Sequence, residues 1–96
     1  MKAILRYSHK LRIQDRYLLE LVIHEVPKTA IQTLGLRYRL ICIDLRSGAR
    51  VLMDNHHPKG PHMHIDDAEV AYEFTTEERL ISDFKSIVHE KMGIEL

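Results

Sequence analysis

The stretch RYLLELVIHEV, residues 16–26, decides the fold that this sequence predicts. Its odd-numbered positions form an unbroken apolar face made of Tyr17, Leu19, Leu21 and Ile23. The even-numbered positions mix apolar residues with Glu20 and His24. Successive side chains of a strand point to opposite faces of a sheet, so a period of two over this length predicts a strand with one buried face.

A second, longer apolar region follows and predicts an antiparallel hairpin. Pro27 ends the first strand, because proline offers no N–H to a ladder and restricts the residue before it. Residues 36–45 then alternate at first and become nearly continuously apolar, which is typical of a central strand. Ser47 and Gly48 supply a turn, and the apolar pattern returns over residues 50–54. We therefore expect residues 36–54 to form a hairpin.

Shorter apolar segments flank this centre. Residues 3–7 predict a short strand, and a turn is expected around Gln14 and Asp15. Residues 62–66 form an extended segment, and residues 70–74 predict one more short strand because their apolar side chains are in phase. The sheet should therefore contain about five to six strands.

The C-terminal region predicts an amphipathic helix over about residues 76–91. Apolar residues recur at helical spacing, namely Leu80, Ile81, Phe84, Ile87 and Val88. Thr75 and Glu78 fit a capping box, and Gly93 suits a helix C-terminus. Strands followed by one helix predict an α+β fold: a largely antiparallel sheet with the C-terminal helix packed on one face.

Composition limits the class of protein. The chain has 96 residues, which is enough for one domain, expected to span 1–96. Its 14 basic and 14 acidic residues cancel, so a nucleic-acid role would need a local basic patch. The single cysteine, Cys42, excludes an internal disulfide and predicts a reduced core thiol. No apolar run is long enough to span a bilayer and no signal peptide is evident, so we expect a cytoplasmic protein that does not enter membranes.

The polar stretch DNHHPKGPHMHID, residues 54–66, contains four of the seven histidines. His62 and His64 are two residues apart in an extended segment, so both imidazoles should project from one face. Three interpretations remain open. The first is that these are solvated residues of a loop held irregular by proline and glycine.

The second interpretation is acid/base chemistry on a phosphate ester. His62 and His64 would transfer protons to and from the reacting oxygens, and Lys59 would neutralise the developing charge. Asp54 would orient an imidazole, as carboxylates do in many sites. Arg37 and Arg39 on one strand, with Arg46 and Arg50 around the hairpin turn, could contact phosphates, although solvated strand faces and turn charges are the favoured explanation of these four residues.

The third interpretation is a divalent metal site. Two imidazoles on one face of a strand can meet one ion, and Asp54, His56, His57 or Asp66 could complete the set, with Asp66 as the predicted third ligand. A carboxylate from outside the stretch is an equal alternative. No other cofactor is predicted.

The order of these segments resembles the TumE-type toxin family of bacterial and archaeal toxin–antitoxin pairs. The resemblance runs from about residue 15 to the end of the helix. Its most particular part is DN followed shortly by KGxHxH, which falls on Asp54, Asn55, Lys59, Gly60, His62 and His64. His56 and His57 do not belong to the family pattern.

The resemblance implies a small cytoplasmic toxin that is neutralised by an antitoxin, usually a helix-turn-helix DNA-binding protein. If the motif carries the activity, the catalytic group comprises Asp54, Asn55, Lys59, His62 and His64. The enzyme would then be a ribonuclease or another phosphodiester-directed hydrolase or transferase, with RNA as a candidate partner. A non-enzymatic interaction module and a small metal-binding domain remain as alternatives, and an exposed sheet edge or face could also support a homodimer.

Overall fold

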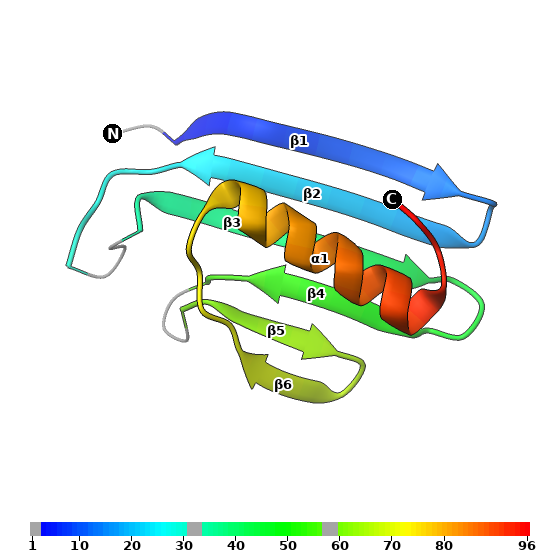
Figure 1. Cartoon of the computed structure of the whole chain (residues 1–96). Coiled ribbons are helices and arrows are strands. Elements are labelled where there is room, and N and C mark those ends of the chain that lie inside the picture. Colours follow the sequence, from blue (N-terminus) through cyan, green and yellow to red (C-terminus); the bar gives the residue numbers. More distant parts are fainter. Residues whose placement is uncertain (1–2, 31–33, 57–59) are drawn as a thin grey trace.

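The sheet is a six-stranded antiparallel meander in which the strands pair in chain order. The structure is a computed structural model, and it describes residues 3–30, 34–56 and 60–96. The strands are β1 (Ile4–Ile13), β2 (Tyr17–Glu25), β3 (Leu36–Asp44), β4 (Arg50–Asp54), β5 (His62–Ile65) and β6 (Ala68–Ala71). One helix, α1 (Glu77–Met92), follows them and lies across one face of the sheet (Figure 1). The predicted α+β fold is confirmed.

The core lies between α1 and the middle of the sheet. The helix packs against β3 and β4 and buries Leu80, Phe84 and Val88 completely. The sheet contributes the odd positions of β2 that the sequence pattern assigned to the core, together with Tyr38, Leu40 and Cys42 of β3 and Val51 and Met53 of β4. Cys42 is a free buried thiol, as predicted.

Two strand boundaries differ from those expected. β1 is a strand of 10 residues rather than the short segment 3–7, because its whole length pairs with β2. β6 ends at Ala71 instead of continuing to residue 74. The Tyr72 hydroxyl donates a hydrogen bond to Asp83 of α1 at 2.7 Å, so the chain turns from the sheet toward the helix at this point.

The helix begins one residue later than expected. Thr76 is the N-cap, and its hydroxyl accepts a hydrogen bond from the Arg79 N–H at 3.1 Å. The capping role predicted for Thr75 therefore belongs to its neighbour. Gly93 ends the helix in the left-handed region, with φ of 72°, and its N–H donates to the His89 carbonyl at 2.8 Å.

The second face of the sheet points away from α1, and we call it the open face. Cross-strand pairing brings together on it side chains whose sequence positions are far apart. They are Leu18, Glu20, Val22 and His24 of β2, Arg37, Arg39, Ile41 and Ile43 of β3, Leu52 and Asp54 of β4, and His62 and His64 of β5. No helix covers this face within the described ranges. Nor do those ranges contain a helix long and apolar enough to cross a membrane.

Candidate active site on the open face

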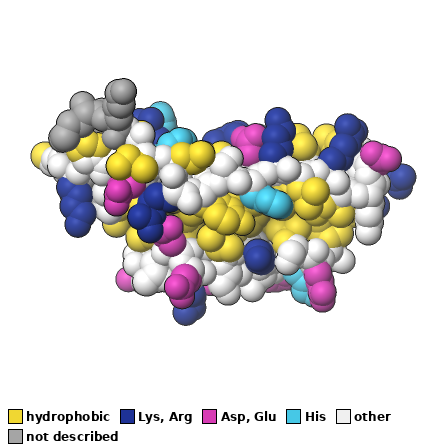
Figure 2. Space-filling model, turned by 90° about the horizontal axis from the view of Figure 1, so that it is seen from above, with side chains coloured by type: hydrophobic (Ala, Val, Ile, Leu, Met, Phe, Trp, Pro, Cys, Tyr) yellow, Lys and Arg dark blue, Asp and Glu magenta, His cyan; other side chains and the backbone are white. Residues whose placement is uncertain are grey.

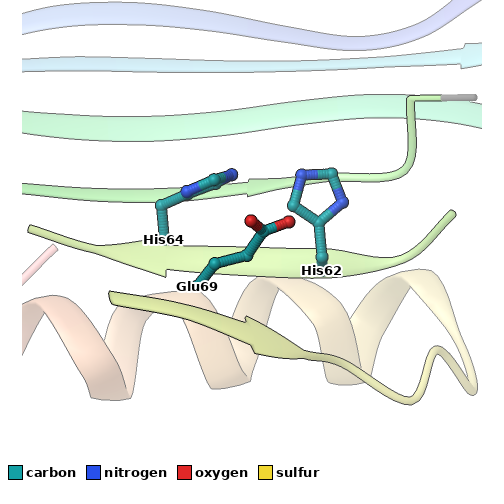
Figure 3. Close-up of side chains that lie close together, drawn as sticks. All are labelled: His62, His64 and Glu69. Atoms are coloured by element: carbon teal, nitrogen blue, oxygen red, sulfur yellow. The ribbon is translucent and has the colours of Figure 1, made fainter. Parts of the chain in front are cut away.

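His62 and His64 stand side by side on β5. Their ring centroids are 5.0 Å apart and the rings meet edge to face at 80°. Figure 3 shows both rings on the same side of the strand, as the spacing predicts. Pairing with β4 sets Asp54 opposite His62 and Leu52 opposite His64. The pair therefore faces the open side of the sheet and does not lie beneath the helix.

His62 is held at both ring nitrogens. Nε2 lies 3.0 Å from Asp54 Oδ1, and Nδ1 lies 2.6 Å from the Gly60 carbonyl oxygen. A carbonyl and an ionised carboxylate only accept hydrogen bonds, and a neutral imidazole donates only one. Both contacts are satisfied together when His62 is an imidazolium beside the Asp54 carboxylate. The side chain of His62 is 10% exposed and that of Asp54 is 17% exposed, so their contact is largely shielded from water.

A carboxylate from outside the histidine stretch lies beside the two imidazoles. Glu69 of β6 pairs across the sheet with His64, and one ligand atom each from His62, His64 and Glu69 lie within 4.8 Å of one another (Figure 3). Asp66, the predicted third metal ligand, instead lies in the β5–β6 turn with φ of 54° and accepts the Arg50 N–H at 3.1 Å. The chain reverses at Asp66 and Asp67 between two short extended runs, and this hairpin signal could have placed Glu69 opposite His64.

Asn55 supports the sheet rather than the histidines. Its side chain is buried, its Oδ1 accepts the Tyr38 N–H at 3.0 Å, and its Nδ2 donates to the Leu36 carbonyl at 2.7 Å. The amide thus continues the pairing of β3 where β4 ends. Although Asn55 was predicted within the catalytic group, these contacts commit both polar atoms of its side chain to the backbone. Lys59 and His57 lie outside the described residues.

A hollow with a volume of about 370 Å³ opens on the same face, and Asp54, the partner of His62, lines it. Its lining includes Arg37, Arg39, His24 and His56, together with Glu20, Val22, Tyr38 and Asp54. Arg39 forms an ion pair with Glu20 at 3.5 Å and remains half exposed. Asp54 joins the two parts of the site, because it lines the hollow and also contacts His62. A small anion in this hollow would meet the two guanidinium groups, with Asp54 between it and His62.

The residues that could hold a metal are His62, His64 and Glu69. Two imidazoles and one carboxylate form a familiar set for zinc and for non-haem iron. Ligands at about 2.1 Å from one ion can be at most about 4.2 Å apart, so three ligand atoms that lie within 4.8 Å of one another need at most a small rotation to meet one ion. His62 would also have to release Asp54 or Gly60. Cys42 is not available, because burial raises the pKa of its thiol to about 11.

The chain matches no family model, no curated protein and no solved structure. The resemblance to the TumE-type toxins consequently rests on the motif residues of this sequence alone. The chemistry open to this site follows from its geometry. That geometry combines a largely buried contact between the His62 imidazole and the Asp54 carboxylate, a second imidazole and a hollow lined by arginine.

Proposed function

We propose that this protein is the toxin of a cytoplasmic toxin–antitoxin pair and that it acts on RNA or another phosphate ester at the open face. The observation that carries the proposal is the position of His62 and His64, whose ring centroids are 5.0 Å apart, with Asp54 linking His62 to a hollow that Arg37 and Arg39 also line. The resemblance to TumE-type toxins supports the biological setting. It also supports a helix-turn-helix antitoxin as the neutralising partner.

The roles of the two histidines follow from their contacts. His64 acts as the general base and takes the proton from an RNA 2′-hydroxyl as that oxygen forms its bond to phosphorus. His62, held as an imidazolium, gives its Nε2 proton to the leaving 5′-oxygen as the P–O5′ bond breaks. The leaving oxygen replaces Asp54 as the partner of that N–H. No external oxidant or metal is needed for the charges and protons to balance.

The arginines account for binding and charge stabilisation. A phosphate in the hollow would accept hydrogen bonds from Arg37 and Arg39, whose planar guanidinium groups suit phosphate oxygens. Lys59 remains a predicted contributor from outside the described residues. Glu20 faces Arg39 from β2, and its ion pair would hold the guanidinium in place until a phosphate enters.

The test is growth arrest on induced expression in bacteria, together with cleavage of single-stranded RNA by purified protein. Loss of a general acid or base typically costs about 10² to 10⁴ in rate, so His64→Ala and His62→Gln should each lower cleavage by that range and relieve the arrest. His89→Ala, which changes an exposed helix histidine, should behave like the wild type. Equal cleavage by His64→Ala and wild type would contradict the proposal.

A metal-dependent role is the second candidate, favoured by the position of Glu69. The same cleavage assay, run with and without a chelator on untagged protein, separates the two. Activity that survives chelation and the Glu69→Gln change supports metal-free acid/base chemistry. Activity that disappears on chelation, with stoichiometric metal lost in Glu69→Gln, supports the metal site instead.

A further inference from the structure

We propose that the outer edge of β1 and the groove beside it bind an extended segment of another protein in which apolar and acidic residues alternate. The segment would add to the sheet as a seventh strand next to the six already present. This proposal does not depend on the chemistry of the open face. It concerns the opposite end of the sheet from the histidine pair.

The first observation is the length and exposure of the edge. β1 has 10 residues, all of them exposed except the half-buried Ile13. In the part of the chain that the structure describes, β2 is the only strand that pairs with β1. At about 3.4 Å per residue the edge is about 34 Å long. Such an edge offers a row of backbone N–H and C=O groups to an added strand.

The second observation is an apolar groove on the helix side of this edge. The helix packs on β3 and β4, and a groove of about 280 Å³ is lined by residues of β1 and β2, by Lys85 of α1 and by the residues that follow the helix. The groove is lined by Tyr7, His9, Leu11, Ile13, Leu19, Leu21, Lys85, Glu95 and Leu96. Figure 2, which looks onto the molecule from the β1 side, shows hydrophobic surface along this edge. Every second side chain of an added strand would face the groove, so those side chains should be apolar.

The third observation is the charge on the other side of the same edge. Lys10 and Arg12 are 69% and 61% exposed, and each has one carboxylate at 3.8 Å, that of Glu20 for Lys10 and that of Asp15 in the β1–β2 turn for Arg12. β1 itself contains no acidic residue. On the open face the sign of charge alternates from β1 to β3, because Glu20 of β2 lies 3.8 Å from Lys10 of β1 and 3.5 Å from Arg39 of β3. The next strand beyond Lys10 would continue this alternation with an acidic residue. Opposite charges on neighbouring strands stabilise a sheet.

These charges favour a partner protein over a second copy of the chain. Two β1 strands placed edge to edge would bring Lys10 and Arg12 near the basic residues of the other copy, with no carboxylate from either strand between them. Like charges on neighbouring strands destabilise the pairing, and basic edge residues are a common means of preventing self-association. The occupant is therefore an acidic, apolar-alternating segment of another chain.

Fluorescence anisotropy with two labelled ten-residue peptides tests the proposal. One peptide alternates Val and Glu, and the other alternates Val and Lys. The wild type should bind the Val/Glu peptide at least about tenfold more tightly than the Val/Lys peptide. The double change Lys10→Glu and Arg12→Glu should invert this preference. Binding of the Val/Lys peptide by that variant would also show that it is folded.

A matched control changes net charge equally elsewhere. Arg46→Glu with Lys91→Glu alters two exposed residues of the β3–β4 turn and of α1, and it should leave the preference for the Val/Glu peptide unchanged. Leu11→Gln should weaken binding of the Val/Glu peptide by removing an apolar contact in the groove. Equal binding of both peptides, or an unchanged preference after reversal of Lys10 and Arg12, would overturn the proposal. The proposal would also be overturned if the wild type formed a dimer and the double change Lys10→Glu and Arg12→Glu disrupted it.

Discussion

The carboxylate of Asp44 joins the two turns at one end of the sheet. It accepts hydrogen bonds from Arg16 Nε at 3.1 Å and Nη2 at 2.8 Å, and from the Arg46 N–H at 2.9 Å. The Arg16 guanidinium and these backbone donors hold the pKa of the Asp44 carboxyl well below its usual range. Arg16 also lies over the Tyr17 ring, 5.1 Å from its centroid. The Asp44 carboxylate at the end of β3 is thus bound to Arg16, which immediately precedes β2.

The lowered pKa of Asp44 means that the folded protein should lose stability as the pH falls into the acid range. Because the folded state holds the Asp44 proton less tightly than the unfolded state, its contribution is complete above the ordinary aspartate pKa of about 3.9 and is lost as the pH falls below it. We expect Asp44→Asn to lower the melting temperature at pH 7. The gap between variant and wild type should narrow as thermal melts are repeated at decreasing pH below about 4.

Asp15→Asn is the control for this measurement. Asp15 has φ of 50° and a side chain that is 98% exposed, and its ion pair with Arg12, at 3.8 Å, is solvated. Asparagine therefore tolerates the backbone and removes an exposed ion pair that contributes little to stability. Its melting temperature should follow the wild type at every pH. A gap for Asp44→Asn that stays constant down to acid pH would show that the carboxylate charge is not what stabilises the two turns.

The positions of individual site residues could be predicted only where spacing along one strand fixes the face of the sheet on which their side chains lie. The separation of two between His62 and His64 places both rings on one face in any extended segment. Glu69 comes from the next strand, so its position depends on the register set by the turn at Asp66. Asn55 falls within the motif that resembles the TumE-type toxins, yet its hydrogen bonds to β3 depend on a pairing that local sequence does not reveal.

At the scale of elements, the two adjacent threonines before α1 provide a sharp test of how the helix begins. Thr76 is the N-cap and satisfies the Arg79 N–H, while Thr75 lies outside the helix. Removing an N-cap hydroxyl typically costs about 1 kcal/mol. We expect Thr76→Ala to lower the free energy of unfolding by about that amount, measured by urea denaturation.

Thr75→Ala is the matched control, because it removes the same hydroxyl one residue earlier. It should change the free energy of unfolding by less than about 0.5 kcal/mol, as most surface substitutions do. A larger loss for Thr75→Ala than for Thr76→Ala would place the cap at Thr75, as the sequence pattern alone suggests. Both threonine side chains are exposed, so neither substitution should change the open face.

Elements with strong periodicity were predicted well, and those with mixed patterns were not. The alternation in residues 16–26 predicts β2, and the helical spacing of five apolar residues predicts α1 to within one residue of its observed bounds. β1 was predicted too short because Ser8, His9 and Lys10 break the apolar pattern, although β2 provides partners for them. β6 was displaced because Tyr72 and Phe74 are in phase with a strand but pack toward the helix and Tyr38.

At the scale of the whole molecule, the helix divides the sheet into a covered centre and exposed edges. α1 packs on β3 and β4, whereas β1 and all four residues of β6 are exposed. Local opening of a few exposed residues costs far less than global unfolding, which is about 5–15 kcal/mol for small proteins. We therefore expect amide hydrogen exchange to be slowest in β3 and the facing part of α1, and fastest among the strands in β6.

Phe84→Ala turns this expectation into a test of cooperativity. Phe84 is completely buried between α1 and the sheet, and truncating a buried phenylalanine costs about 3–5 kcal/mol. Amides of β3 that exchange only through global unfolding should lose protection by that amount. Amides of β6 should keep their wild-type rates, because they already exchange by local opening. Equal loss of hydrogen-exchange protection in β6 and β3 would contradict this expectation. It would show that the six strands open as one unit and that packing of the helix also stabilises the edge strands.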